Sequence, residues 1–343
     1  MKKIGVITGG GDSPGTNAAI RAIVKRANLD GIDILGFKDG WAGLIKNDWQ
    51  VLGLKEVSGV LPSGGTLLGS SRTNPFKTEE GVSKVRETYK KNGLDALIAI
   101  GGDDTLGVAH KLKDYGIKAV GIPQTIDNDL AETEFAIGFD SALARVTEAI
   151  DGLHTTAYSH HRVMVVEVMG RDSGWIGLFG GLAGGADIIL VPEEPYTVKE
   201  IKKRIEERRA KGKNFSIVVI SEGAKPVELD QQITKGTETD EFGHVRLSGI
   251  GHYLADQLRE ILDMDVRVTR LAYLQRGGQA TPFDRLLATR FGVLAVELCI
   301  NGDFDEMTAL KASKVVPVEL EKMLSKSPKP IDKKLLDLRK IFY

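Results

Sequence analysis

The chain has 343 residues, of which 42% are hydrophobic and 27% charged, and its 46 basic and 47 acidic residues give a formal net charge of −1. This length predicts a large core shared between two lobes, and the composition is that of an ordinary globular protein. The balanced charge argues against a general affinity for nucleic acid or for anionic membranes, so we expect neither as a partner.

The single cysteine and the short length of the apolar runs indicate the cellular compartment of the protein. Cys299 lies in an apolar run, which predicts a buried thiol, and a lone cysteine excludes a disulfide within the chain. No run approaches the ~20 apolar residues of a membrane span, and the run after Met1 is too short for a signal peptide. We therefore expect a cytoplasmic protein.

Short apolar runs alternate with amphipathic stretches along the chain. Runs of Val, Ile and Leu that end in Gly predict strands buried on both faces, and stretches such as TNAAIRAIVKRANLDG (16–31) and TVKEIKKRIEERRAKGK (197–213) predict helices. This alternation predicts an α/β fold with parallel sheets. The runs are, in chain order, KIGVITGGG (3–11), DILGFKDGW (33–41), DALIAIGGDDT (95–105), KAVGIPQTIDND (118–129), RVMVVEVMGRDSGW (162–175), DIILVPEE (187–194), FSIVVISEG (215–223) and VRVTRLAYLQRGG (266–278).

Most predicted strands end in Gly, Asp, Arg or Glu, as in GGGDS, GGDDT, QTIDND, MGRDSG, SEG and QRGG. Ligands of open α/β sheets bind at the carboxyl edge of the strands, so these loops favour one convergent site over a set of ordinary polar loops. The polar segment 227–244 predicts an exposed insertion.

The loop TGGGDSPGTN (8–17) follows the first predicted strand and opens the first predicted helix. Backbone N–H groups in a Gly-rich turn at a helix N-terminus bind phosphate. The loop is not a dinucleotide-binding fingerprint, because Pro14 replaces the third glycine, and it is not a Walker A loop, because Thr16 replaces the lysine. A turn that serves only packing is the alternative.

Thr125, Asp127 and Asp129 alternate in PQTIDND, so an extended segment would place them on one face. A carboxylate there is suited to accept a proton from a sugar hydroxyl, and a second carboxylate can help to place Mg²⁺ through water. A turn capped by Asx side chains is the alternative. Forked phosphate-binding side chains are offered by Arg72, Arg162, Arg171 and Arg276.

Taken in order, TGGGDSPGTN, GGDDT, PQTIDND, MGRDSGW, SEG and QRGG resemble the 6-phosphofructokinase family, from Gly5 to about Pro317. GHVRLSGIG resembles the subgroup with both ATP-using and diphosphate-using members. The resemblance implies phosphorylation of D-fructose 6-phosphate at its 1-hydroxyl to fructose 1,6-bisphosphate. It also implies Mg²⁺ as cofactor, and a homodimer or homotetramer.

The resemblance assigns roles to individual residues. Asp127 would be the base that takes the proton from the sugar 1-hydroxyl, supported by Thr125 and Asp129, and Asp103 would hold Mg²⁺. Tyr273 stands where the family commonly has His, and it can donate a hydrogen bond to the sugar phosphate without carrying a positive charge. The donor would lie at Gly11, Arg72, Asp104 and Gln124, and fructose 6-phosphate at Met169, Gly170, Arg171, Glu222, Tyr273 and Arg276, with Arg162 and Arg267 contributed by a neighbouring subunit.

The resemblance also implies two lobes, each a mostly parallel sheet flanked by helices, with the active site at the strand carboxyl ends between them. We expect residues 1–138 plus 251–301 to form the lobe that binds the phosphoryl donor and Mg²⁺. Residues 139–250 plus 302–320 would form the sugar-phosphate lobe, and residues 321–343 a peripheral C-terminal tail.

GGDDT bears on the choice of donor. In ATP-using members the residue after the metal-binding Asp is usually Gly, which leaves room for the α-phosphate of the nucleotide. A carboxylate at Asp104 would repel that phosphate by roughly 4 kcal/mol at about 4 Å and an effective dielectric near 20, whereas inorganic diphosphate has no third phosphate to repel.

Gln124 complicates this choice, because diphosphate-using members carry Lys there. Because Gln offers only a neutral hydrogen-bond donor, we expect roughly tenfold weaker catalysis than with Lys, unless another cation takes the place of Lys. ATP remains the alternative donor if Asp104 is instead the N-cap of the next helix. A non-catalytic subunit that binds sugar phosphate is the alternative of another class.

Overall fold

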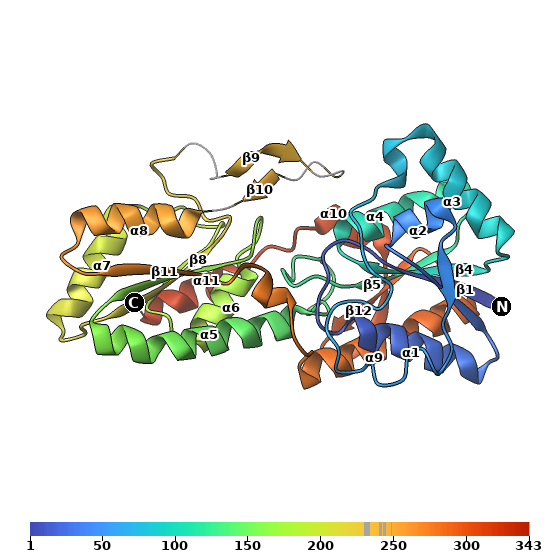
Figure 1. The fold of residues 1–343 in the computed structure, drawn as a ribbon, viewed down its shortest axis with the longest axis horizontal. Helices are drawn as coiled ribbons and strands as arrows, with labels where there is room; N and C mark the ends of the chain where they lie inside the picture. Colours follow the sequence, from blue (N-terminus) through green and yellow to red (C-terminus); the bar gives the residue numbers. More distant parts are fainter. Residues whose placement is uncertain (230–233, 240–241, 243–244, 248, 343) are drawn as a thin grey trace. The chain divides into compact units, whose positions relative to one another are not determined.

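The computed structural model describes residues 1–229, 234–239, 242, 245–247 and 249–342. The chain divides into two compact units, each of which contains a sheet rich in parallel strands with helices packed on it (Figure 1). This confirms the α/β prediction. Unit 1 comprises Met1–Ser141, Asp240–His244 and Arg276–Lys329, and unit 2 comprises Ala142–Thr239, Val245–Gln275 and Pro330–Tyr343.

Unit 1 is built on a seven-stranded sheet in the order β13-β12-β5-β4-β1-β2-β3. The five inner strands run parallel, and β3 and β13 are antiparallel edge strands. The inner strands β1, β2, β4 and β5 are mostly apolar because helices cover the sheet on both sides. The strands are β1 (Lys3–Thr8), β2 (Asp33–Phe37), β3 (Trp49–Val51), β4 (Ala96–Gly101), β5 (Ala119–Pro123), β12 (Glu306–Lys311) and β13 (Lys314–Glu319).

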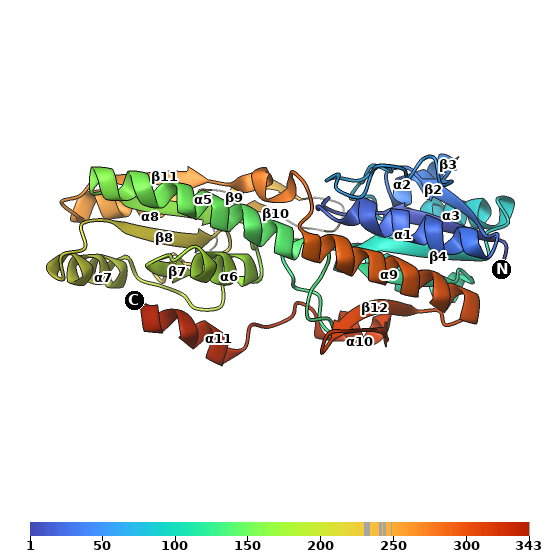
Figure 2. The ribbon, with the colours of Figure 1, turned by 90° about the horizontal axis from the view of Figure 1, so that it is seen from below.

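Two cores lie on the opposite faces of this sheet. On one face α1 (Thr16–Leu29) and α9 (Pro282–Asn301) lie side by side (Figure 2). They approach closely at Gly292, where an added Cβ would lie 2.7 Å from the backbone oxygen of Ala19. The other face carries α2 (Trp41–Lys46), α3 (Glu79–Lys91), α4 (Asp103–Lys111) and α10 (Leu320–Lys326), with the short helices η1 (Pro75–Lys77) and η2 (Leu112–Tyr115) beside them.

Unit 2 is built on a four-stranded parallel sheet in the order β11-β6-β8-β7. α7 and α8 pack on one face, and α6 packs on the other, where an added Cβ at Gly181 would lie 2.8 Å from Ile189. The strands are β6 (Val163–Val168), β7 (Ile188–Leu190), β8 (Ser216–Ser221) and β11 (Val266–Arg270), and an antiparallel pair is formed by β9 (Thr234–Thr239) and β10 (Val245–Leu247). The helices are α5 (Phe139–His160), α6 (Trp175–Ala183), α7 (Val198–Ala210), α8 (Ile250–Ile261), α11 (Lys333–Leu338), η3 (Ala272–Arg276) and η4 (Arg339–Phe342).

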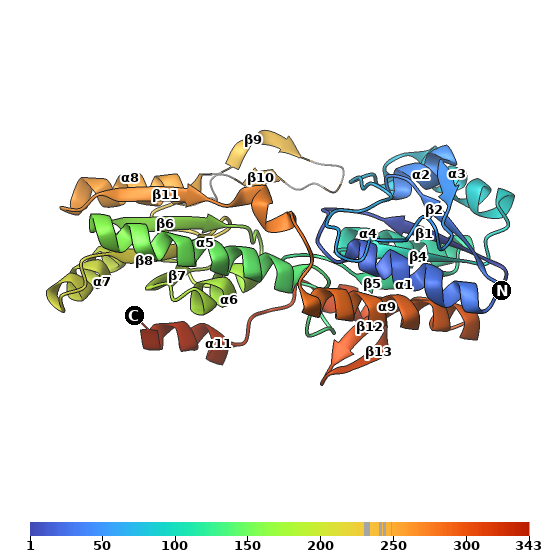
Figure 3. The same cartoon turned by 60° about the horizontal axis from the view of Figure 1, so that its bottom comes forward.

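The observed division differs from the expected lobe boundaries. Residues 302–320 belong to unit 1, because β12 pairs with β5 and then with β13; Figure 3 shows these two strands beside α9. Residues 251–275 belong to unit 2, because β11 pairs with β6. The prediction was wrong for both segments because strand partners far apart in the sequence cannot be read from local patterns.

Residues 321–343 are not a peripheral tail. α10 is packed into unit 1, and Met323 on it is fully buried. In unit 2, Arg339 is 4% exposed, donates to the backbone oxygen of Ile189 at 2.7 Å and pairs with Glu194. This segment is therefore part of the core of both units.

Two further predictions concern particular segments. Across the described part of the chain, no helix combines the length and the apolar character that crossing a membrane requires. The exposed insertion predicted for 227–244 falls partly outside the described residues, which within that span are 227–229, 234–239 (β9) and 242.

Candidate active site

The carboxyl ends of β1, β4 and β5 meet at one edge of the sheet of unit 1. Thr8 is in register with Ile100, and Gly101 with Pro123. The loops after these strands start side by side, since the N–H of Gly9 donates to the backbone oxygen of Ile100 at 3.0 Å. The sequence motifs TGGGDSPGTN, GGDDT and PQTIDND therefore meet at this edge, which brings together three of the six loops for which one convergent site was predicted.

The Gly-rich loop after β1 is held between α4 and residues 70–72. An added Cβ at Gly9 would lie 2.6 Å from the hydroxyl of Thr105, and Gly10 has a φ of +81°, which favours glycine. The N–H of Gly10 donates to the backbone oxygen of Ser71 at 3.1 Å, and the hydroxyl of Ser70 donates to the backbone oxygen of Gly10 at 2.6 Å. Arg72, which is exposed, follows directly on this contact.

Gln124 connects this loop to the end of β5. It is 2% exposed, and its side-chain nitrogen donates to the backbone oxygen of Gly11 and to the hydroxyl of Ser13, both at 2.9 Å. These bonds use both N–H groups of the amide. Gln124 thus fixes the carbonyl of Gly11, a role that the sequence did not reveal.

The guanidinium group of Arg276 also lies against the Gly-rich loop. Its Nη1 donates to the backbone oxygen of Asp12 at 3.2 Å and would lie 2.5 Å from a Cβ added at Gly11. The resemblance assigned Arg276 to the sugar phosphate, and the structure brings it to the loop assigned to the donor. A full positive charge therefore lies beside Gly11.

Asp103 and Asp104 open α4. The N-cap of this helix is Gly102, so the alternative interpretation of Asp104 as the N-cap is wrong. Asp103 is exposed and Asp104 is half-buried. The N-terminal end of a helix stabilises negative charge, which makes two adjacent carboxylates tolerable here.

The exposed carboxylate of Asp103 is suited to bind Mg²⁺ together with phosphate oxygens of a substrate. Within the described residues, no three His, Cys, Asp or Glu side chains gather so that they could hold a metal ion by themselves. Mg²⁺ usually binds one or two carboxylates together with substrate phosphates and waters, so an exposed carboxylate at a phosphate-binding edge fits it.

The three candidates Thr125, Asp127 and Asp129 come together, but through a turn rather than an extended segment. The hydroxyl of Thr125 accepts from the N–H of Asp127 at 3.2 Å and donates to Asp129 at 3.5 Å. Asn128 has a φ of +51° and bonds both Glu134 and Ala136 across the loop. The backbone N–H of Asp127 and the carboxylate of Asp129 thus meet at the same hydroxyl.

A buried carboxylate behind this loop was missed by the sequence. Asp284, on α9, is fully buried and accepts from the N–H of Gly138 at 3.0 Å, the N–H of Ser141 at 2.8 Å and the hydroxyl of Ser141 at 2.6 Å. Burial raises the pKa of Asp284 to about 6, and the hydrogen bonds oppose that shift. The sequence TPFD signals the start of a helix, with Thr281 as N-cap, but not that this acid also holds the first turn of α5.

Candidate sugar-phosphate residues gather at the carboxyl edge of the sheet of unit 2. Val168 is in register with Ser221, so Met169, Gly170 and Arg171 start beside Glu222. Gly170 has a φ of +127°, and its carbonyl accepts from the N–H of Gly223 at 3.1 Å. The fully buried Gln275, which sequence reasoning missed, accepts from the N–H of Met169 at 3.2 Å.

Arg162 and Arg267 lie at the opposite end of this sheet. Arg162 precedes β6 and Arg171 follows it, and a six-residue strand spans roughly 20 Å. Both Arg162 and Arg267 contact Asp265, with nitrogen–oxygen distances of 2.7 and 3.1 Å. Within one chain, Arg162 and Arg267 are thus separated from Arg171. Tyr273, in η3, is 75% exposed.

The chain is similar to known proteins along most of its length. A family model described as phosphofructokinase matches residues 3–299. The pyrophosphate–fructose 6-phosphate 1-phosphotransferase of Amycolatopsis methanolica is 52% identical over 319 residues, which cover 93% of each chain. The ATP-dependent 6-phosphofructokinase 3 of Streptomyces coelicolor is 48% identical over 319 residues, again covering 93% of each. The crystal structure of Pichia pastoris phosphofructokinase in the T-state has a TM-score of 0.84 and 33% identity over 99% of this chain and 36% of that longer chain.

Proposed function

Because the chain belongs to the phosphofructokinase family, we propose that it reversibly transfers a phosphoryl group from inorganic diphosphate to the 1-hydroxyl of D-fructose 6-phosphate. The product would be fructose 1,6-bisphosphate. Relatives named for diphosphate and for ATP match the chain at 52% and 48% identity, so similarity alone does not choose the donor. The observation that carries the choice is the carboxylate of Asp104.

Asp104 lies in the first turn of α4, directly after the residue proposed to hold Mg²⁺. At about 4 Å and an effective dielectric near 20, this carboxylate would cost a passing α-phosphate roughly 4 kcal/mol. That is several hundred-fold in affinity, on the order of 1.4 kcal/mol per tenfold. Diphosphate carries no group into this space, so the penalty falls on ATP alone.

Arg276 could supply the positive charge that diphosphate-using members carry as Lys at the position of Gln124. Its guanidinium group beside Gly11 supplies a cation to the donor loop. Hydrogen bonds from a charged group contribute roughly 1.5–3 kcal/mol, against about 0.5–1.5 for neutral ones. Gln124 would act on the donor indirectly, by fixing the peptide of Gly11.

Asp127 is the proposed base. It would accept the proton of the 1-hydroxyl as the hydroxyl oxygen attacks the terminal phosphorus and the remaining phosphate leaves. Thr125 and Asp129 would hold Asp127 in place through the hydroxyl that they share. Mg²⁺, when held by Asp103 and the donor oxygens, would neutralise charge on the donor.

Met169, Gly170, Arg171 and Glu222 are proposed to bind fructose 6-phosphate, with Tyr273 as a further hydrogen-bond donor. Arg162 and Arg267 lie too far along the same sheet to join them within one chain. They would instead complete the site of a neighbouring subunit, in a homodimer or homotetramer. The proposed setting is the cytoplasm, where the buried Cys299 would stay reduced.

A donor assay tests the proposal. Purified protein, Mg²⁺ and fructose 6-phosphate are incubated with diphosphate or with ATP, and fructose 1,6-bisphosphate is measured. We expect turnover with diphosphate, and a rise of at least tenfold in kcat/KM for ATP in Asp104→Gly. The matched control Asp114→Gly removes an exposed carboxylate at the far end of the same segment and should leave the donor ratio unchanged.

Other outcomes would contradict specific steps. Turnover with ATP alone would mean that Asp104 does not face the nucleotide, and the ATP-dependent reaction would take the place of the proposed one. Turnover with neither donor would favour the non-catalytic sugar-phosphate-binding alternative.

A further inference from the structure

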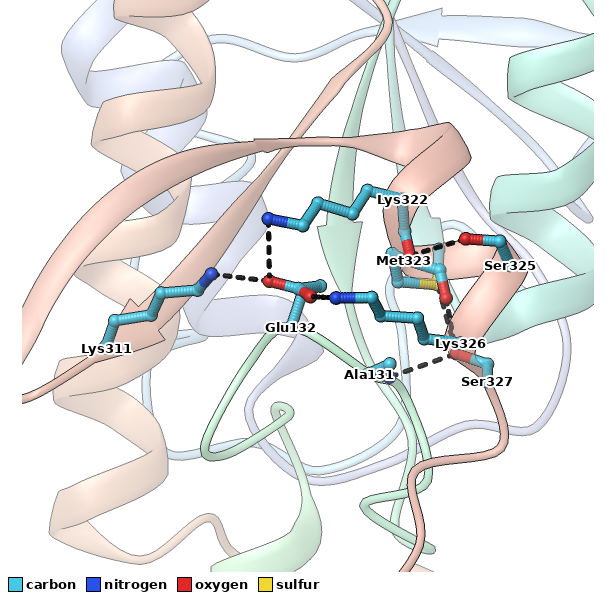
Figure 4. Close-up of polar contacts among 8 residues, drawn as sticks. All are labelled: Ala131, Glu132, Lys311, Lys322, Met323, Ser325, Lys326 and Ser327. Carbon is cyan, nitrogen blue, oxygen red and sulfur yellow. Dashed lines mark hydrogen bonds and ion pairs between the residues drawn. The ribbon is translucent and has the colours of Figure 1, made fainter.

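The loop that carries Asp127 and Asp129 continues to residue 136, and the end of unit 1 packs along it. The N–H of Lys329 donates to the backbone oxygen of Asp129 at 2.6 Å. The hydroxyl of Ser327 accepts from the N–H of Ala131 at 3.0 Å (Figure 4). Residues 321–329, which the sequence predicted to lie in a peripheral tail, therefore form hydrogen bonds with the backbone of the proposed catalytic loop.

Glu132 is held at the same place by three lysines. Lys311 of β12 and Lys326 of α10 each approach its carboxylate to 2.6 Å, and Lys322 approaches to 3.6 Å; Figure 4 shows them converging. The hydrogen bonds from Lys311 and Lys326 lower the pKa of Glu132 to about 2, and the charge of Lys322 acts in the same direction. Glu132 has a φ of +62°, a conformation that is costly for a side chain with a Cβ, so the surrounding contacts must stabilise it.

The Lys329 side chain completes this arrangement. Its ammonium group donates to the backbone oxygens of Thr133 and Glu134, both at 3.0 Å. The oxygen of Glu134 also accepts from the side chain of Asn128, the residue between the two aspartates. Lys329 thus contacts the loop at two places. Its backbone N–H bonds Asp129, and its side chain bonds Thr133 and Glu134.

We propose that Lys329 is a positioning residue for Asp127. This inference rests on the proposed function, because Asp127 is the base of that reaction. The ammonium group of Lys329 holds the backbone oxygen of Glu134, to which the side chain of Asn128 also donates. Loss of the ammonium group would therefore let Asn128 shift, and with it Asp127 and Asp129 on either side. A misplacement of about 1 Å at a catalytic group can cost on the order of 100-fold in rate without removing a substrate contact.

The test compares matched lysine variants of the full chain. Lys329→Met removes the ammonium group, and Lys329→Arg keeps a charged donor. Lys340→Met is the control. Lys340 also lies in the C-terminal segment, and its ammonium group donates to two acceptors, Glu194 and Asp337. Among the described residues it makes no contact with the loop. We measure kcat and KM with the donor that the wild-type protein uses, and the equilibrium binding of fructose 6-phosphate.

We expect kcat of Lys329→Met to fall roughly 10–100-fold, with fructose 6-phosphate binding changed less than about twofold. Lys329→Arg should recover most of the rate, and Lys340→Met should match the wild type. An unchanged kcat in Lys329→Met, or a loss confined to KM, would overturn the inference while leaving the proposed function intact. If Lys329→Met does not fold, Lys329→Gln, which keeps an N–H donor without the charge, is held to the same expectation.

Hydrogen exchange gives a readout that does not depend on activity. Backbone amides of residues 127–136 should exchange faster in Lys329→Met than in the wild type and in Lys340→Met. Equal exchange in all three proteins would refute the positioning role. A wild-type protein that is inactive with both donors would instead refute the proposed function, and the exchange data would still decide whether Lys329 holds the loop.

Discussion

Replacing Asp284 by Asn is expected to destabilise unit 1 strongly, although the two side chains have almost the same shape. One carboxylate oxygen accepts from the N–H of Gly138, and the other accepts from both the N–H and the hydroxyl of Ser141. Asn has a single acceptor oxygen, so its NH₂ group must face at least one of these donors. A buried donor left without a partner costs roughly 1–3 kcal/mol, and the lost charge weakens the bonds that remain.

The expected cost is therefore about 2–4 kcal/mol in the free energy of unfolding, measured by urea denaturation at pH 8. At this pH the carboxylate is ionised, because its pKa of about 6 lies well below. The matched control is Asp151→Asn, an exposed substitution on α5 that should change stability by less than about 0.5 kcal/mol. A cost below about 1 kcal/mol for Asp284→Asn would show that the three bonds do not hold the start of α5, contrary to this reasoning.

Two further outcomes are expected. Asp127→Asn should lower turnover by roughly 10²–10⁴-fold, because it removes the proposed base, while the measured affinity for fructose 6-phosphate stays within a few-fold; substantial remaining activity would exclude Asp127 from that role. The lowered pKa of Glu132, about 2 in the folded chain, means that its lysine contacts stabilise the protein above pH 4.5 and stop doing so as the pH falls toward 2. The three lysine side chains are 42–55% exposed, so solvent screening limits the contribution of these contacts to the free energy of unfolding to about 1–2 kcal/mol. Thermal unfolding of the wild type and Glu132→Gln should converge over that pH range, and a difference that does not depend on pH would contradict the assignment.

The parts of the fold that sequence reasoning predicted are those with local signals. Apolar runs ending in Gly marked the inner strands of both units, and their polar ends marked the edges where Asp103, Asp127 and Arg171 lie. β12, by contrast, has the sequence EMTALK, in which polar residues interrupt the apolar ones. Its partner β5 lies far away in the sequence, so neither its existence nor its unit could be inferred from a local pattern.

The sequence predicted at which strand ends the candidate residues lie, but not the contacts that these residues make. Gln124 was considered only as a ligand for the donor, because nothing in the sequence shows that its amide meets Gly11 and Ser13. Arg276 reaches the Gly-rich loop from the other end of the chain, and Lys329 reaches Asp129 from a segment expected to be peripheral. Contacts between distant segments depend on tertiary packing, which residue spacing does not encode.

The late position of β12 and α9 in the chain has a consequence for synthesis. When β1, β4 and β5 have left the ribosome, the open edge of β5 and the apolar face of α1 have no partner until the whole first part of unit 2 has followed. An unpaired strand edge beside an uncovered apolar helix favours association with other nascent chains. Unit 1 therefore cannot be completed until β12 and α9 have been made, and the growing polypeptide carries an open strand edge and an uncovered apolar helix face until then.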